Sequence, residues 1–254
     1  MIRRFIERLL GRGTHPSPET PATEPAARSD SGAVLRELAG YARPAAVAEI
    51  GGFRPPDDPR CSWFGGRGVG LPGEQLPTYM GKEMFPLLQI NVTELPVVPP
   101  ALEGVELLVL FMNRDDIPFD LPHGEGWLIR EYQSLESLVA LPSPSAEPPV
   151  RPFPIRWKRV EGELPGWEDA WSLLDLTAVN DDEDATEKFF ADLQNHPGTK
   201  VWGYPAEIQH EVGIEGFVFQ VGSEEKSGWA WADNGIGYFF READGSWKFA
   251  CQFY

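Results

Sequence analysis

The segment FPLLQINVTELP, residues 85–96, places a glutamine in the middle of an apolar, strand-like run. Gln89 stands between Leu88 and Ile90, and burying an amide without hydrogen-bond partners costs several kcal/mol. We therefore expect this amide to bond backbone groups of a neighbouring strand or of a nearby glycine-rich turn. The alternative is an amide that lines a pocket.

A second segment, FVFQV at residues 217–221, repeats the pattern around Gln220. In both places 15 residues separate the glutamine from the glycine that opens the next apolar run, Gly104 or Gly235. A turn with an aromatic residue and glycine precedes each run, at residues 63–66 and 202–205. This registered repetition predicts a tandem duplication with pseudo-repeats at about residues 33–140 and 150–254, each supplying antiparallel strands.

The residues after position 50 are typical of antiparallel sheet, since glycine and proline separate short β-branched and aromatic runs. We expect an α+β fold, mostly antiparallel β, with two tandemly duplicated halves and a few peripheral helices. Helices are predicted at residues 33–41, with Ser31 as the cap, and at residues 185–193, after an acidic start at 180–184. A proline-rich connector covers residues 141–166, and its alternating part at 150–160 predicts an edge strand.

The N-terminal segment differs from this background. Residues 1–13 contain four arginines and one glutamate, with apolar residues at helical spacing: Ile2, Phe5, Ile6, Leu9 and Leu10. This pattern predicts a basic amphipathic helix. A proline-rich flexible tether follows it, so that residues 1–32 form a region separate from a single domain at residues 33–254. The helix is expected to contact a membrane surface or a larger assembly, or else to pack on its own domain or fray.

A series of short motifs resembles the YwqG-like family of bacterial proteins. In the first half these are residues 62–66 (SWFGG), 85–91 (FPLLQIN) and Gly104; in the second they are residues 203–205 (GYP), 217–220 (FVFQ), 231–240 (WADNGIGYFF) and Trp247. The resemblance covers residues 33–254, while residues 67–70 and Ala232 depart from the family pattern. It implies an internally duplicated, mostly antiparallel α+β fold, a family without an established activity, and members encoded among toxin and immunity genes.

Composition restricts the class of partner. The formal net charge is −17 and the pI is about 4.6, which argues against nucleic acid and favours a basic protein. Cys61 and Cys251 are 190 positions apart, so neither a disulfide framework nor a clustered zinc site is expected. No apolar run approaches the roughly 18 residues of a membrane span, and the start lacks a secretory signal. We expect a cytoplasmic protein.

Motifs of catalysis are not found. The sequence has no nucleophile elbow, no P-loop and no paired zinc-binding histidines, and its four histidines are scattered along the chain: His15, His123, His196 and His210. The acidic run at residues 180–184 lacks the spaced ligands of a calcium loop and is better explained as a solvated helix start. We expect no catalytic residue, no cofactor and no metal.

The remaining candidates for binding are aromatic. Trp229 and Trp231 alternate as in a strand, beside Asp233. We expect most of this cluster to be core and any exposed part to form a recognition face, with carboxylates steering a basic partner. The sequence thus predicts a non-catalytic intracellular bacterial binding protein, such as an immunity or accessory factor for a toxin or other basic protein. The alternative is an enzyme or small-ligand module whose cleft between the halves is lined by Gln89, Gln220, Trp231 and Asp233.

Overall fold

The computed structural model describes residues 30–254. The predicted basic helix at residues 1–13, and the part of the predicted tether before residue 30, lie outside this described region. None of the helices within residues 30–254 has the length and the apolar character needed to cross a membrane.

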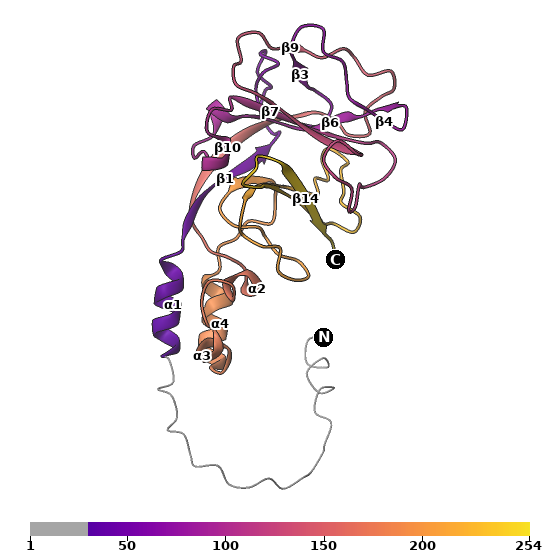
Figure 1. The fold of residues 1–254 in the computed structure, drawn as a ribbon. Coiled ribbons are helices and arrows are strands. Elements are labelled where there is room, and N and C mark those ends of the chain that lie inside the picture. Colours follow the sequence, from indigo (N-terminus) through magenta and orange to yellow (C-terminus); the bar gives the residue numbers. More distant parts are fainter. Residues whose placement is uncertain (1–29) are drawn as a thin grey trace, which may run out of the picture.

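One ten-stranded sheet dominates the described chain (Figure 1), and every pairing in it is antiparallel. The expectation of a mostly antiparallel β fold with a few helices is confirmed. The sheet curls so that its two ends face one another, with β6 and β7 above β14 in Figure 1. In spatial order its strands are β14 (Trp247–Gln252), β13 (Ile236–Arg241), β12 (Phe217–Gly222), β11 (Lys200–Trp202), β1 (Arg43–Ile50), β10 (Phe153–Glu163), β2 (Trp63–Phe64), β6 (Phe85–Asn91), β7 (Leu107–Met112) and β8 (Trp127–Tyr132).

Smaller elements cover the outer side of β6 and β7. Val69 of one small sheet packs on Leu107, Val109 and Phe111, which all point to that side of β7. The small sheets are β3 (Val69–Gly70) with β9 (Val139–Ala140) and β4 (Thr78–Tyr79) with β5 (Lys82–Glu83). Two 3-10 helices, η3 (Val92–Glu94) and η4 (Pro100–Leu102), lie between β6 and β7 in the sequence and contribute to the main core.

The main core lies between the two ends of the curled sheet. Trp127 of β8 contacts Phe239 of β13 and Phe249 of β14, with ring centroids 5.8 and 5.6 Å apart. Residues from both ends share one buried cluster, which includes Leu88, Leu110, Phe219 and Trp231. The interior between the two ends of the sheet is therefore filled with apolar side chains.

Strand β10 occupies the middle of the sheet, which corrects the prediction of an edge strand at residues 150–160. It pairs with β1 on one side, from Arg43 opposite Glu163 to Ile50 opposite Ile155, and with β2 on the other. The alternation of polar and apolar residues reports which face of a strand is solvated, and β10 does have an exposed face. Alternation carries no information about which backbone edges are paired, so the prediction failed there.

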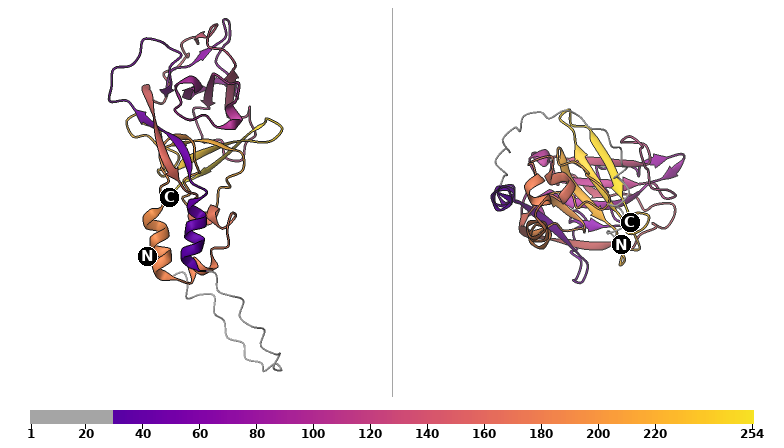
Figure 2. Two further views of the ribbon diagram at one scale, coloured as in Figure 1. Left: turned by 90° about the vertical axis from the view of Figure 1, so that its left-hand side faces the viewer. Right: turned by 90° about the horizontal axis from the view of Figure 1, so that it is seen from below.

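Four short helices form a second unit, which we call the helical bundle (Figures 1 and 2). It lies next to the start of β1 and the end of β10. Its core comprises apolar side chains from all four helices, including Leu38, Ala170, Val179 and Phe189. The helices are α1 (Ser31–Ala39), α2 (Trp167–Ala170), α3 (Thr177–Asn180) and α4 (Glu183–Asp192).

The caps of two helices test the sequence predictions. Asp30, rather than Ser31, caps α1 by accepting from the backbone N–H of Gly32. The hydroxyl of Ser31 instead donates to Asp182 at 2.7 Å, and this long-range contact ties α1 to α4. Asp182 also caps α4, with Glu183 and Asp184 in its first turn, so the prediction of an acidic helix start is confirmed.

A single carboxylate joins the two ends of the sheet. Glu131 on β8 accepts from the guanidinium of Arg241 at 3.0 Å and from the indole N–H of Trp247 at 2.8 Å. Arg241 also donates to the carbonyl of Ala101. Because β8 and β14 are the outermost strands of the sheet, these bonds connect elements that the backbone ladder leaves apart.

We predict that Glu131→Ala lowers the free energy of unfolding by about 1–3 kcal/mol, since Arg241 and the Trp247 indole lose their shared, partly buried acceptor. Glu242→Ala is the control, because this exposed glutamate lies 4.0 Å from Lys248 and should change stability by less than about 0.5 kcal/mol. Urea unfolding of both variants measures the difference. Equal effects would contradict the closing role of Glu131.

Candidate functional site

Gln89 is fully buried and bonds backbone groups only. Its Oε1 accepts from the N–H of Val69 at 3.0 Å, and its Nε2 donates to the carbonyls of Pro59 at 2.8 Å and Cys61 at 2.6 Å. These bonds fix the loops on either side of β2. The expected satisfaction of the amide by nearby backbone is confirmed.

Gln220 makes the matching set of bonds. Its Oε1 accepts from the N–H of Ala206 at 2.9 Å, and its Nε2 donates to the carbonyls of His196 at 3.1 Å and Gly198 at 2.8 Å. Trp63 stands opposite Gln89 in the ladder, and Lys200 stands opposite Gln220. The two bonded carbonyls belong to the residues four and two positions before Trp63 in the first case and before Lys200 in the second. The bonded N–H belongs to the residue six positions after Trp63 or Lys200.

The two amides do not meet. Residues opposite one another in an antiparallel pair point to the same face, and Gln89 stands opposite Val109, which packs on the outer side of β7. Gln220 stands opposite Tyr238, which belongs to a separate outer cluster with Phe240. Each glutamine therefore lies on an outer side of the curled sheet, and the main core separates them. A shared cleft lined by both is not present in the described chain.

The tryptophans predicted for binding belong mostly to the core. Trp231 is fully buried and packs on Trp229 and Phe249, with centroids 5.0 and 5.3 Å apart. Trp229 is half-buried against Phe85 and lies in a loop held by one bridge, not in a strand. Asp233 is the exposed member of the set. The expected recognition face is thus reduced to Asp233 and the rim of Trp229.

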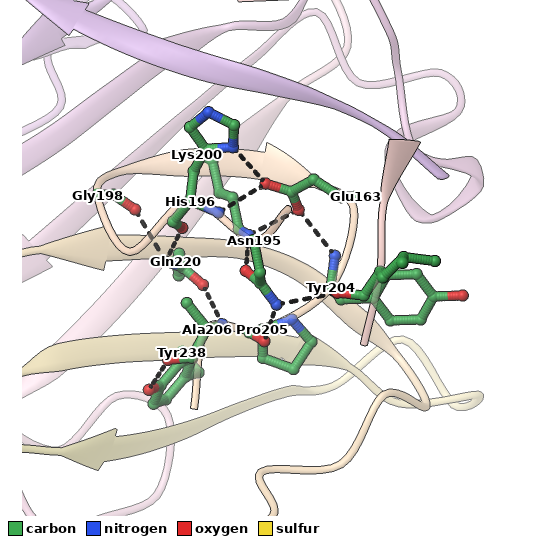
Figure 3. Close-up of polar contacts among 11 residues, drawn as sticks. Glu163, Asn195, His196, Gly198, Lys200, Tyr204, Pro205, Ala206, Gln220 and Tyr238 are labelled. Atoms are coloured by element: carbon green, nitrogen blue, oxygen red, sulfur yellow. Dashed lines mark hydrogen bonds and ion pairs between the residues drawn. The ribbon is translucent and has the colours of Figure 1, made fainter. Parts of the chain in front are cut away.

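A buried ion pair, absent from the sequence predictions, joins the end of β10 to the start of β11 (Figure 3). Lys200 Nζ donates to Glu163 Oε2 at 2.7 Å, and both side chains are completely inaccessible. Asn195 Oδ1 accepts a second bond from Lys200 at 2.6 Å. Glu163 Oε1 accepts from the backbone and the ring of His196, both at 3.0 Å, and its Oε2 also accepts from the N–H of Tyr204.

A β-bulge aims Glu163 at this site. The register of β10 against β1 shifts by one residue between Val160 and Glu163, and Gly162 has φ +78°. An extra residue with a glycine at positive φ reverses the side-chain alternation, so Glu163 turns inward. The isolated glycine at position 162, inside a strand-like run, was the one available signal in the sequence, and it gave no indication of Lys200 as the partner.

The Lys200–Glu163 pair has a structural role. Burial lowers the pKa of Lys200 to about 8. A shifted lysine is often a reactive group, but no atom of this one meets solvent, so neither substrate nor cofactor reaches it. The network instead fixes residues 193–206, the connection from the helical bundle to β11.

A second carboxyl group anchors the helical bundle. Glu207 accepts from the N–H of Asp169 in α2 at 2.6 Å, and Asp169 accepts from the N–H of Gly213 at 2.9 Å. Burial, together with the neighbouring Asp169 charge, raises the pKa of Glu207 to about 7, and burial also raises the pKa of Asp169. Asp169 Oδ2 is buried and accepts no hydrogen bond from the described N–H and O–H groups, and the raised pKa of Glu207 lowers the charge of this pair of carboxyl groups.

The helical bundle also exposes aromatic side chains that the sequence patterns did not indicate. Trp171 and Phe190 are 39% and 54% exposed, and Trp167 lies between them. The rings of Trp167 and Phe190 stack with centroids 5.5 Å apart, and Trp171 meets Trp167 edge-on at 6.1 Å. We call Trp167, Trp171 and Phe190 the aromatic patch. In the described residues no group of three metal-ligating side chains comes together.

A known family covers most of this structure. The model of DUF1963, a domain of unknown function, matches residues 62–245. The chain belongs to this family. The match in this DUF1963 protein spans β2 to β13 and therefore both glutamines, while α1, β1 and β14 lie outside it. No curated protein matches the sequence.

We predict that Lys200→Met costs about 3–5 kcal/mol of the free energy of unfolding, because it leaves Glu163 as an uncompensated buried charge. Adding Glu163→Gln should recover part of the loss, since the amide is neutral and retains an oxygen for the N–H of Tyr204. Urea unfolding of both variants tests this. A loss below about 1 kcal/mol in the single variant would show that the pair is not a determinant of stability.

We predict that the contribution of Glu207 to the free energy of unfolding falls as pH rises between about 4.5 and 7. Glu207 holds its proton in the folded state up to about pH 7, whereas in the unfolded chain it loses the proton near its ordinary value of about 4.3. The folded state therefore binds more protons than the unfolded chain between these two pH values. The stabilisation that results is fully present below about pH 4.5 and is lost as the pH rises through about 7.

Glu207→Gln has no proton to lose in this range and should flatten this dependence. Glu187→Gln, at an exposed carboxylate on α4, is the control and should follow wild type. Thermal unfolding from pH 5 to 8.5 gives the comparison. A Glu207→Gln profile parallel to wild type would contradict a raised pKa at Glu207.

Proposed function

We propose that this DUF1963 protein is a non-catalytic intracellular binding protein whose partner is a basic protein, recognised by the helical bundle. The observation that carries the proposal is the aromatic patch, which is exposed on the most acidic part of the chain. Residues 164–195 contain nine carboxylate residues and one lysine. Exposed aromatic side chains within a charged surface are typical of the anchors of protein interfaces.

Charge selects the class of partner. Most of the carboxylates of this segment are exposed: Glu168, Asp175, Asp181, Glu183, Asp184, Glu187 and Asp192. Such a concentration steers a basic protein toward the surface and repels an acidic one. Trp171 and Phe190 would then supply the contact area.

The role we propose is steric masking, as in an immunity or accessory factor that covers a toxin or another basic protein. This role requires a rigid scaffold and an adhesive surface, and no reactive group. We also propose that the chain belongs, within its family, to the YwqG-like proteins and that it is located in the bacterial cytoplasm, and steric masking agrees with both.

We further propose that residues 33–140 and 150–254 arose by tandem duplication with exchange of the first strands. The matched glutamine bonds support it, as does a second pair of contacts: Ser62 Oγ accepts from the N–H of Asn91 at 3.0 Å, and Thr199 Oγ1 accepts from the N–H of Gly222 at 3.2 Å. In the sheet order, β1 lies beside β11 and β10 lies beside β2. Each proposed repeat thus gives its first strand to the other repeat.

The test is capture by the immobilised full chain from a lysate of the native host. A captured protein is identified, purified, and measured against the wild type and against Trp171→Ala combined with Phe190→Ala. We expect a basic protein whose affinity falls at least tenfold in the double variant and falls with rising salt.

Phe119→Ala is the matched control, because Phe119 is 46% exposed and lies outside the helical bundle. It should bind like wild type. Asp233→Ala tests the surface first expected near Trp229. Capture that is unchanged in the double variant, or lost only in Asp233→Ala, would move the site away from the helical bundle, and an acidic partner would overturn the proposal.

A further inference from the structure

An apolar groove runs between α1 and α4 on the helical bundle. Leu35, Leu38 and Ala39 line it from α1, and Leu164 and Phe189 line it from the other side. Lys188 and Asp192 pair with each other along α4 at its margin. The groove has a volume of about 320 Å³ and is distinct from the aromatic patch, which lies on other side chains of α2 and α4.

We propose that residues 1–13 of the same chain dock in this groove as a basic amphipathic helix. Their apolar side chains form one stripe at helical spacing, and Phe5 and Leu9 are neighbours on it. A cavity of roughly 150 Å³ accommodates a benzene ring. The groove therefore takes about two side chains of that size, which fits an i, i+4 pair such as Phe5 and Leu9.

The charges along the groove are balanced, because Arg36 and Lys188, the two cations that line it, are paired with Asp30 and Asp192. The helical bundle as a whole is acidic, with nine carboxylate residues and one lysine in residues 164–195. Residues 1–13 carry four arginines against one glutamate. The net charge of the helical bundle would therefore attract a basic helix.

The length of the connection permits this docking. Sixteen residues, 14–29, link the basic segment to Asp30, and a coil of that length spans roughly 20–24 Å. Helix α1 has nine residues and is therefore about 14 Å long. The groove starts at Gly32, two residues after Asp30, so it is within reach along its whole length. Tethering also supplies an effective concentration of order mM, which favours the chain's own segment over an outside helix.

Paramagnetic broadening in the full chain tests the proposal. A nitroxide is attached at Gly11→Cys, on the side of the helix opposite the apolar stripe. The native thiols should label poorly, because burial raises the pKa of Cys61 and of Cys251 to about 12, and the unsubstituted chain checks this. We expect amide signals of α1 and α4 to lose at least half their intensity relative to the reduced label, and signals of β13 to keep theirs.

Matched variants locate the contact. Ala39→Gln fills the groove and should abolish the broadening, whereas Ala33→Gln, at an exposed alanine of the same helix that does not line the groove, should leave it unchanged. The double variant Phe5→Ser and Leu9→Ser changes the docking segment instead of the groove and should also abolish the broadening. Melting temperatures confirm that each variant is folded.

Three results would overturn self-docking. One is an isolated chain without broadening at α1 and α4, which would leave the groove to an outside partner. Another is broadening that appears equally when spin-labelled chains are mixed with isotope-labelled chains that carry no nitroxide, which would assign the groove to a second copy. The third is equal loss of broadening in Ala33→Gln and Ala39→Gln. None of these depends on capture by the aromatic patch, so the two proposals can fail separately.

Discussion

The pairing of β1 with β10 is the contact on which the rest of the structure depends. It joins segments more than a hundred residues apart, and it is the central ladder of the described sheet, with four strands on either side of the pair. The helical bundle is attached at the same place, since α1 leads directly into β1 and α2 follows β10. Glu163 lies at the bulge where this ladder ends. Its bonds to Lys200 and His196 hold the connection from the helical bundle to β11. Without this ladder, neither the curled sheet nor the position of the helices would be defined.

Local signals in the sequence predicted local structure well. The buried amides of Gln89 and Gln220, the acidic start of α4 and the antiparallel class all follow from a chemical demand that neighbouring residues must meet. Long-range neighbours were not predictable in this way. The central position of β10 depends on partners distant in sequence, and Lys200 gives no sign that Glu163, 37 positions earlier, neutralises it. Spacing suggested a strand at Trp229 and Trp231, whereas the loop there turns Trp231 into the core.

The two buried polar groups that attach the helical bundle have different physical roles. The Lys200–Glu163 pair is inaccessible and positions a loop, while Glu207 and Asp169 hold α2 through bonds to backbone N–H groups, and the pKa of Glu207 is raised to about 7. Both attach an acidic, aromatic-bearing unit to a scaffold whose interior is filled. This arrangement agrees with a division of labour in which the sheet supplies rigidity and the helical bundle supplies contacts. The proposed basic segment and the proposed basic partner would then share one electrostatic field.

The order of strands also constrains how the chain is made. Strand β1 leaves the ribosome early, but its neighbours β10 and β11 come roughly a hundred or more residues later. At translation rates of roughly 5–20 residues per second, β1 waits on the order of 5–20 seconds for its first partner. The Trp247 indole that meets Glu131 is synthesised 116 residues after it. The sheet therefore closes only after β14 has been made, and the apolar strands β6 and β7 depend until then on each other and on their own overlying loops.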